Sequence, residues 1–301
     1  MAAASIQEGR VVRWLALAND DEAALARAKI DGIRRLLLGF GAARTWIWVA
    51  LGGAPSAVHV PVAVVLTVCA ALAWFRKTAW LAPWIALPLL LVQVASTFPM
   101  TDNHFFLEVL CVGLLCSTGR DENDDRLVLQ GMGWLTAIIL FETGLQKVLY
   151  GLYFHGEFLA FMVGRGGRFA ALFDYMLPAD EVARLAAIDP MRTGAGPFRL
   201  SSPVFVALSN LIWIAEMGLA PLLLVRRSRV AAAIAALLLV VAIQLGAREL
   251  GFALLFGSLL LLFLPIDLVR RLAPVAIAAL AWAALAAWGL VPGGTWIGRT
   301  L

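Results

Sequence analysis

The chain has 301 residues, of which 62% are hydrophobic and only 15% are charged. With a mean hydropathy of +0.87, this composition excludes an ordinary soluble domain and predicts an all-α, polytopic bundle of transmembrane helices. The net charge of +4 comes from 24 basic and 20 acidic residues. The basic residues gather at the ends of apolar segments, which indicates control of membrane topology and not nucleic-acid binding.

The N-terminal segment, residues 1–32, is polar and partly charged and lacks the apolar core of a signal peptide. Its apolar residues between Val11 and Ala28 recur with a helical spacing. This pattern predicts an amphipathic helix that lies on the membrane surface with Trp14 near the lipid headgroups. The remainder, residues 33–301, is expected to form a single transmembrane domain.

Apolar segments follow one another along this domain, and about nine of them are predicted to cross the membrane. A bilayer crossing needs about 20 apolar residues, so several segments are short, and the fourth is the shortest. The predicted spans are residues 33–53, 60–75, 80–98, 104–117, 128–150, 204–225, 230–246, 251–267 and 272–291.

Basic clusters predict the orientation of these spans. They lie at the start of the first span, after the second, between the sixth and seventh, and between the eighth and ninth. With nine spans and a cytoplasmic N-terminus, every cluster falls on the cytoplasmic side, as the positive-inside rule requires. The expected protein is a multi-pass protein of the cell inner (plasma) membrane with an extracytoplasmic C-terminus. The clusters are Arg27, Lys29, Arg34 and Arg35; Arg76 and Lys77; Arg226, Arg227 and Arg229; and Arg270 and Arg271.

Residues 151–203 form the one sizeable segment outside the predicted spans. Within it, residues 157–163, 168–177 and 180–188 are expected to be helical, with glycines between them. We expect an extracytoplasmic insertion whose interfacial helices cap the outer face of the bundle.

Two polar strings lie at the outer ends of the fourth and fifth spans. Asn103 and His104 begin one span and Lys147 ends the other, so all three are expected at one membrane face. Ionisable side chains in membrane segments are costly and commonly functional. A poorly hydrated Lys147 can lose its proton and act as a base, His104 can relay protons, and Asn103 can donate a hydrogen bond to an oxyanion.

Further polar residues near these strings are candidates for a ligand pocket. Glu108 follows His104 at the i, i+4 spacing on one helix face. Glu142 lies about 140° around the helix from Lys147 and is not expected to be its direct partner. The full set of pocket candidates is Asp102, Glu108, Glu142, Glu216, Arg248 and Glu249.

Structural interpretations of the same residues stay open. Lys147 at a span end can simply extend toward the headgroups, and His104 can cap its helix. Glu142 and Glu216 can be paired with structural partners. No P-loop, dinucleotide-binding, zinc-protease or serine-hydrolase motif occurs, and no metal site is predicted.

At the two polar strings the chain resembles the vitamin K-dependent gamma-carboxylase superfamily, including its small bacterial, carboxylase-like transmembrane (HTTM) members. One match is Asn103-His104-Phe105 with Leu107, and the other is Gly144-Leu145-Gln146-Lys147 followed by Gly156. A further similarity covers residues 209–265, so the resemblance extends over roughly residues 30–267. It implies that Lys147 is the catalytic base, that His104 and Asn103 assist it, and that a reduced quinone of the vitamin K type is the cofactor.

The chain also departs from the carboxylases. It lacks their large luminal, substrate-binding region, and Gly156 follows Lys147 at a longer interval than in the family. The resemblance therefore implies a lyase- or oxygenase-type reaction on a quinol or another lipid-soluble molecule, and not protein carboxylation.

Other classes of function remain open. The chain can be a non-catalytic accessory or assembly subunit of a membrane complex, and a weaker similarity to lipase maturation factors fits that role. It can also be a transporter with intramembrane glutamates as a proton relay, although no inverted repeat is visible. The expected partners are membrane lipids, a quinone and another membrane protein, and not nucleic acid.

Overall fold

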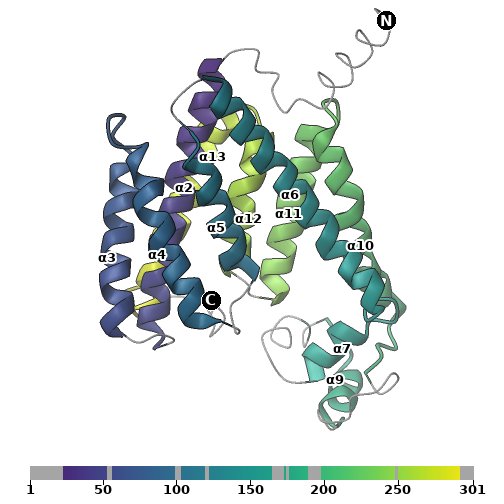
Figure 1. The fold of residues 1–301 in the computed structure, drawn as a ribbon. Helices are drawn as coiled ribbons and strands as arrows, with labels where there is room; N and C mark the ends of the chain where they lie inside the picture. The colour runs from purple at the N-terminus through teal and green to yellow at the C-terminus, as the bar shows by residue number, and fades with distance from the viewer. Residues whose placement is uncertain are drawn as a thin grey trace, which may run out of the picture.

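A computed structural model describes residues 23–52, 56–98, 103–118, 122–164, 173, 176–188, 198–247 and 250–291. These residues form eleven α-helices and one short 3₁₀ helix, and no strand occurs among them (Figure 1). The all-α fold expected from the composition is confirmed. An amphipathic helix is predicted in residues 1–32. Residues 1–22 of this segment lie outside the described residues.

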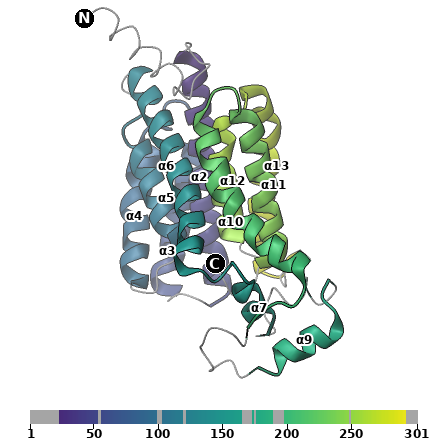
Figure 2. The ribbon, with the colours of Figure 1, turned by 90° about the vertical axis from the view of Figure 1, so that its right-hand side faces the viewer.

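Nine helices make up the main bundle. Consecutive helices run in opposite directions, and α6 packs against α10 while α2 packs against both α3 and α13 (Figure 1 and Figure 2). The bundle helices are α2 (Ala23–Ala50), α3 (Ser56–Leu72), α4 (Leu81–Thr97), α5 (Asn103–Leu115), α6 (Glu122–Tyr150), α10 (Pro203–Leu224), α11 (Arg229–Ala247), α12 (Leu250–Leu260) with the 3₁₀ helix η1 (Leu261–Phe263), and α13 (Ile266–Ala287).

Prolines mark the beginning of three helices. Pro203 is the first residue of α10, and Pro265 directly precedes α13. Pro178 likewise precedes α9 (Ala179–Ala186). Proline suits these positions because its fixed φ is compatible with a helix start, where its missing N–H has no partner within the helix.

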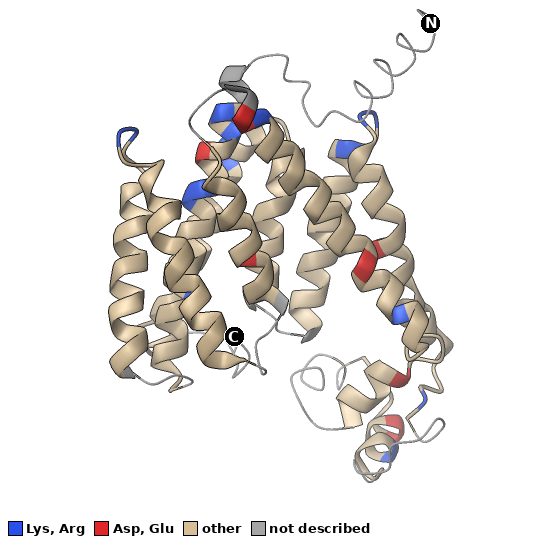
Figure 3. Cartoon of the chain, in the orientation of Figure 1, with Lys and Arg blue, Asp and Glu red and all other residues tan. Residues whose placement is uncertain are grey.

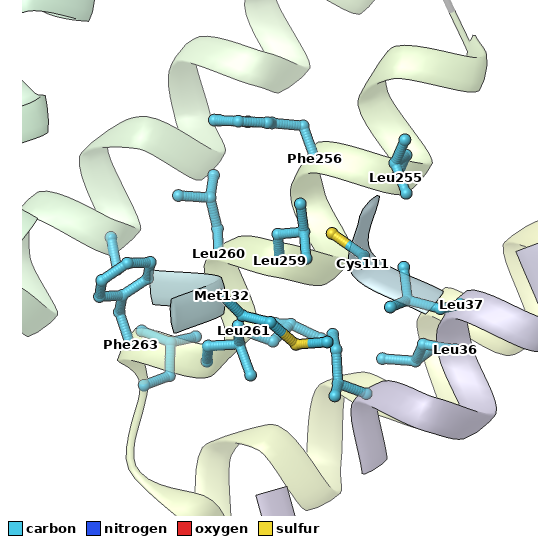
Figure 4. Close-up of a cluster of buried hydrophobic side chains, with 14 of the residues drawn as sticks. Leu36, Leu37, Cys111, Met132, Leu255, Phe256, Leu259, Leu260, Leu261 and Phe263 are labelled. Atoms are coloured by element: carbon cyan, nitrogen blue, oxygen red, sulfur yellow. The ribbon is translucent and has the colours of Figure 1, made fainter. Parts of the chain in front are cut away.

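Helix α12 lies at the centre of the core. Leu255, Phe256, Leu259 and Leu260 are all fully buried, and they pack against side chains of α2, α5 and α6 (Figure 4). A helix that is apolar on every side is stable only when it is surrounded. The apolar run that resembles a span in the sequence is therefore a core helix of only 11 residues.

The expectation of nine membrane-crossing helices is wrong. Helices occupy all nine segments, but among the described residues only four are long and apolar enough to cross a membrane: Asp124–Tyr150, Pro203–Leu224, Arg229–Gly246 and Ile266–Ala287. Helices α3 and α4 have 17 residues each and α5 has 13. At about 1.5 Å per residue they fall short of a hydrocarbon core about 30 Å thick.

Helix α2 is long enough, but its apolar half carries Arg34, Arg35 and Arg44. These charges remove it from the set of candidate spans. The four remaining helices indicate a multi-pass helical membrane protein.

In its described residues, the segment between α6 and α10 contains two short helices beyond one end of the bundle, α7 (Glu157–Gly164) and α9 (Figure 1). Both lie where the sequence predicts helices, whereas residues 168–172, 174 and 175 of the third predicted helix fall outside the described part of the chain. Glu181 of α9 accepts hydrogen bonds from Arg184 and from the backbone N–H of Ser201. The bond from Ser201 fastens α9 to the chain that enters α10.

Candidate functional site

A cavity of about 890 Å³ lies between α5, α6, α7, α10, α11 and α12. Leucine, isoleucine and phenylalanine side chains from these helices make up most of its wall. An apolar wall with a few convergent polar groups is typical of sites for small lipid-soluble ligands. The polar side chains of the wall are His104, Glu142, Thr143, Gln146, Lys147, Tyr153 and Glu216.

An ion pair joins α6 to α10 across the cavity wall. Lys147 Nζ lies 2.8 Å from Glu216 Oε2 and 2.9 Å from Oε1, and it also donates to the Thr143 carbonyl oxygen at 3.3 Å. The Glu216 side chain is only 4% exposed, compared with 20% for Lys147. A buried carboxylate is costly without a cation, so Lys147 stabilises Glu216 in the bundle.

Gly144 allows α10 to approach closely enough for this pair to form. A Cβ at this position would lie 2.6 Å from Met217 Cγ and 3.0 Å from the Trp213 carbonyl oxygen. Because only glycine permits this contact, α10 packs directly on the backbone of α6. Glu216 then reaches Lys147, which lies one helical turn beyond Gly144.

His104 lines the cavity from the start of α5. Its ring packs edge-to-face on Phe252 of α12, with ring centroids 5.3 Å apart. The structure therefore brings His104 and Lys147 to one cavity. Asn103 is the first residue of α5, but its side chain lies outside the described part, as do Asp102, Arg248 and Glu249.

Glu142 also lines the cavity. It lies on α6, one and a half turns before Lys147. Its side chain is exposed, and its Oε1 accepts a hydrogen bond from Gln146 Nε2. Lys147 forms its ion pair with Glu216 and not with Glu142. This agrees with the angle of about 140° that separates Glu142 from Lys147 on the helix.

Glu108 does not line the cavity, although the sequence makes it a pocket candidate. It is 1% exposed and lies 2.9 Å from Arg44 Nη2 of α2. Arg44 also donates to Gln93 of α4 and stacks on the Phe105 ring. Residues four apart on a helix differ by about 40° in direction, enough for His104 to face the cavity while Glu108 faces α2.

Three polar residues of the wall are absent from the sequence-based candidates: Thr143, Gln146 and Tyr153. Gln146 has a signal in the sequence, since it follows Glu142 at the i, i+4 spacing. The pairing of Lys147 with Glu216 has no such signal in the sequence, because 69 residues separate them.

The chain matches no family model, no curated protein and no solved structure. Its function is therefore inferred from the cavity and from the two polar strings.

Proposed function

We propose that this membrane protein is a small carboxylase-like (HTTM) enzyme that binds a quinol-type amphiphile in the cavity and removes a proton from its hydroxyl group. The observation that carries the proposal is the Lys147–Glu216 ion pair in the wall of a large apolar cavity. The cavity volume of about 890 Å³ suits a ring with part of an apolar chain.

In this proposal Lys147 and Glu216 act as one unit. The carboxylate of Glu216 accepts the proton from the hydroxyl group, and the ammonium of Lys147, released from its counter-ion, stabilises the oxyanion that forms. His104 lines the same cavity and relays the proton onward. A reduced quinone would supply the ionisable hydroxyl and two electrons, and dioxygen, whose consumption is measured below, would accept those electrons.

The orientation of the chain is part of the proposal. Among the described residues, most Lys and Arg side chains gather at the end of the bundle opposite α7 and α9 (Figure 3). The positive-inside rule favours a cytoplasmic location for that end. The N-terminus would then be cytoplasmic, and α7 and α9 would lie on the outer side of the inner membrane.

The first test is oxygen consumption by the purified protein in lipid with reduced menaquinone or a vitamin K hydroquinone. We expect Lys147→Ala to lower the rate at least about 100-fold, because it removes the charge that stabilises the oxyanion. Lys77→Ala is the matched control, since Lys77 is exposed and lies outside the cavity wall.

A second variant separates loss of chemistry from loss of folding. Lys147→Ala leaves Glu216 buried without its cation, whereas Lys147→Ala with Glu216→Gln leaves no unpaired charge. The double variant should elute as a monodisperse species and remain inactive. Full turnover in either variant would overturn the proposal, and no consumption by the wild type would favour an accessory subunit with a stoichiometric membrane partner.

A further inference from the structure

The cavity wall carries a carboxylate that the Lys147–Glu216 pair does not neutralise. Glu142 is exposed, lies in the apolar candidate span of α6, and has no ion pair among the described residues. Its Oε1 accepts a hydrogen bond from Gln146, an uncharged side chain. A charge in such a segment is costly unless it meets water or a ligand.

Among the described residues of the wall, carboxylates outnumber cationic side chains. Lys147 is the only Lys or Arg in this part of the wall, and it is engaged by Glu216. Glu142 therefore has no cationic side chain paired with it among the described residues of the wall. A carboxylate or phosphate placed there meets a like charge in an apolar surrounding, where the repulsion is weakly screened.

We propose that Glu142 selects the head group of the ligand. Its carboxylate accepts a hydrogen bond from an O–H or N–H⁺ donor of the head group and excludes amphiphiles with carboxylate or phosphate heads. This inference rests on the proposed function only in taking the cavity as the site for a lipid-soluble ligand.

Selection by Glu142 is separable from the chemistry of the ion pair. Glu142 and Lys147 are five residues apart on α6, which is about 7.5 Å along the helix axis. Glu142 makes no contact with Glu216 or with Lys147 that would be lost on substitution by glutamine. Glu142→Gln thus removes the charge, keeps the shape of the side chain and leaves the pair in place.

The test compares three amphiphiles with the same chain and different heads: dodecylamine, dodecanol and dodecanoate. Binding to the purified full chain is measured by native mass spectrometry from a non-ionic detergent. The wild type should bind the amine and the alcohol at least about tenfold more tightly than the carboxylate. In Glu142→Gln the carboxylate should gain affinity, the amine should lose it, and the preference should disappear.

Asp267→Asn is the matched control, because it also removes one carboxylate but lies outside the cavity with its side chain 84% exposed. It should keep the wild-type preference. Equal binding of all three probes by the wild type, binding of none of them, or an unchanged preference in Glu142→Gln would overturn the inference. The measurement needs no quinone, so loss of quinol turnover alone would contradict the proposed function and leave the role of Glu142 standing.

Discussion

At the scale of single residues, Gly144 decides whether the site can form. It is the point where α6 touches the backbone of α10, and Glu216 lies beside that contact. The same helix face then presents Lys147 to Glu216 at 2.8 Å. A side chain at position 144 would separate the helices, and the ion pair would be lost with the contact.

We therefore expect Gly144→Ala to lower the free energy of unfolding by about 1–3 kcal/mol, because the new methyl group overlaps Met217 and the Trp213 carbonyl oxygen. Gly218→Ala, on α10, is the control. A Cβ at Gly218 meets nothing within 4 Å, so this variant should be stabilised by about 0.5–1 kcal/mol through helix propensity. Thermal unfolding in detergent measures both, and equal stability of the two variants would contradict this account.

Other buried polar residues stabilise the bundle without reaching the cavity. Arg44 binds Glu108 and Gln93, and Gln93 donates in turn to Thr45. Glu108 Oε1 lies 2.5 Å from the place a Cβ of Gly41 would occupy, so the glycine makes room for the carboxylate. This network joins α2, α4 and α5, and it fixes the helix from which His104 enters the cavity.

At the scale of elements, α9 is held by an apolar face, in which Leu185 is fully buried, and by a hydrogen-bonded carboxylate. Arg184, together with the backbone N–H of Ser201, lowers the pKa of Glu181 to about 2. A depressed carboxylate pKa contributes stability above the unfolded value of about 4.3, and this contribution is lost as the pH falls through the folded value. The attachment of α9 should therefore be complete above about pH 5, weaken progressively below about pH 4.3 and be lost near pH 2.

Hydrogen exchange of the α9 backbone amides, corrected for intrinsic rates, measures this attachment. The wild type should keep its protection from pH 7 to about pH 5 and lose it progressively toward pH 2. Glu181→Gln should exchange faster at neutral pH and show no such loss. Protection in the wild type that disappears between pH 5 and pH 4 would show that Glu181 has an ordinary pKa in the folded protein.

At the scale of the whole molecule, charge is distributed unevenly between the two ends of the bundle (Figure 3). Lys77 and Arg227 are exposed in turns at the basic end, whereas Asp180 is exposed on α9 at the other. The positive-inside rule then predicts that the two ends lie in different compartments.

Single cysteines at these positions test the orientation in a chain whose buried Cys69, Cys111 and Cys116 have been replaced. In spheroplasts, a membrane-impermeant maleimide should label Asp180→Cys directly. Lys77→Cys and Arg227→Cys should be labelled only after the membrane is permeabilised. Labelling of Lys77→Cys in intact spheroplasts would reverse the orientation, and equal labelling of all three would contradict a membrane-crossing bundle.

The sequence by itself determined that the fold is helical and membrane-embedded, because apolar segments of this kind satisfy their backbone hydrogen bonds only as helices. It also located every bundle helix, and it singled out His104 and Lys147 because ionisable side chains stand out in apolar segments. The structure places both residues in the wall of one cavity.

Only the tertiary structure decided which helices are long enough to cross a membrane and which polar residues meet. Periodicity does not distinguish a short span from a core helix, so α12 was taken for a span although its neighbours surround it. Likewise, spacing along the chain carries no information on contacts between distant helices. Glu216 therefore meets Lys147, and Glu108 meets Arg44, through packing that depends on Gly144 and Gly41.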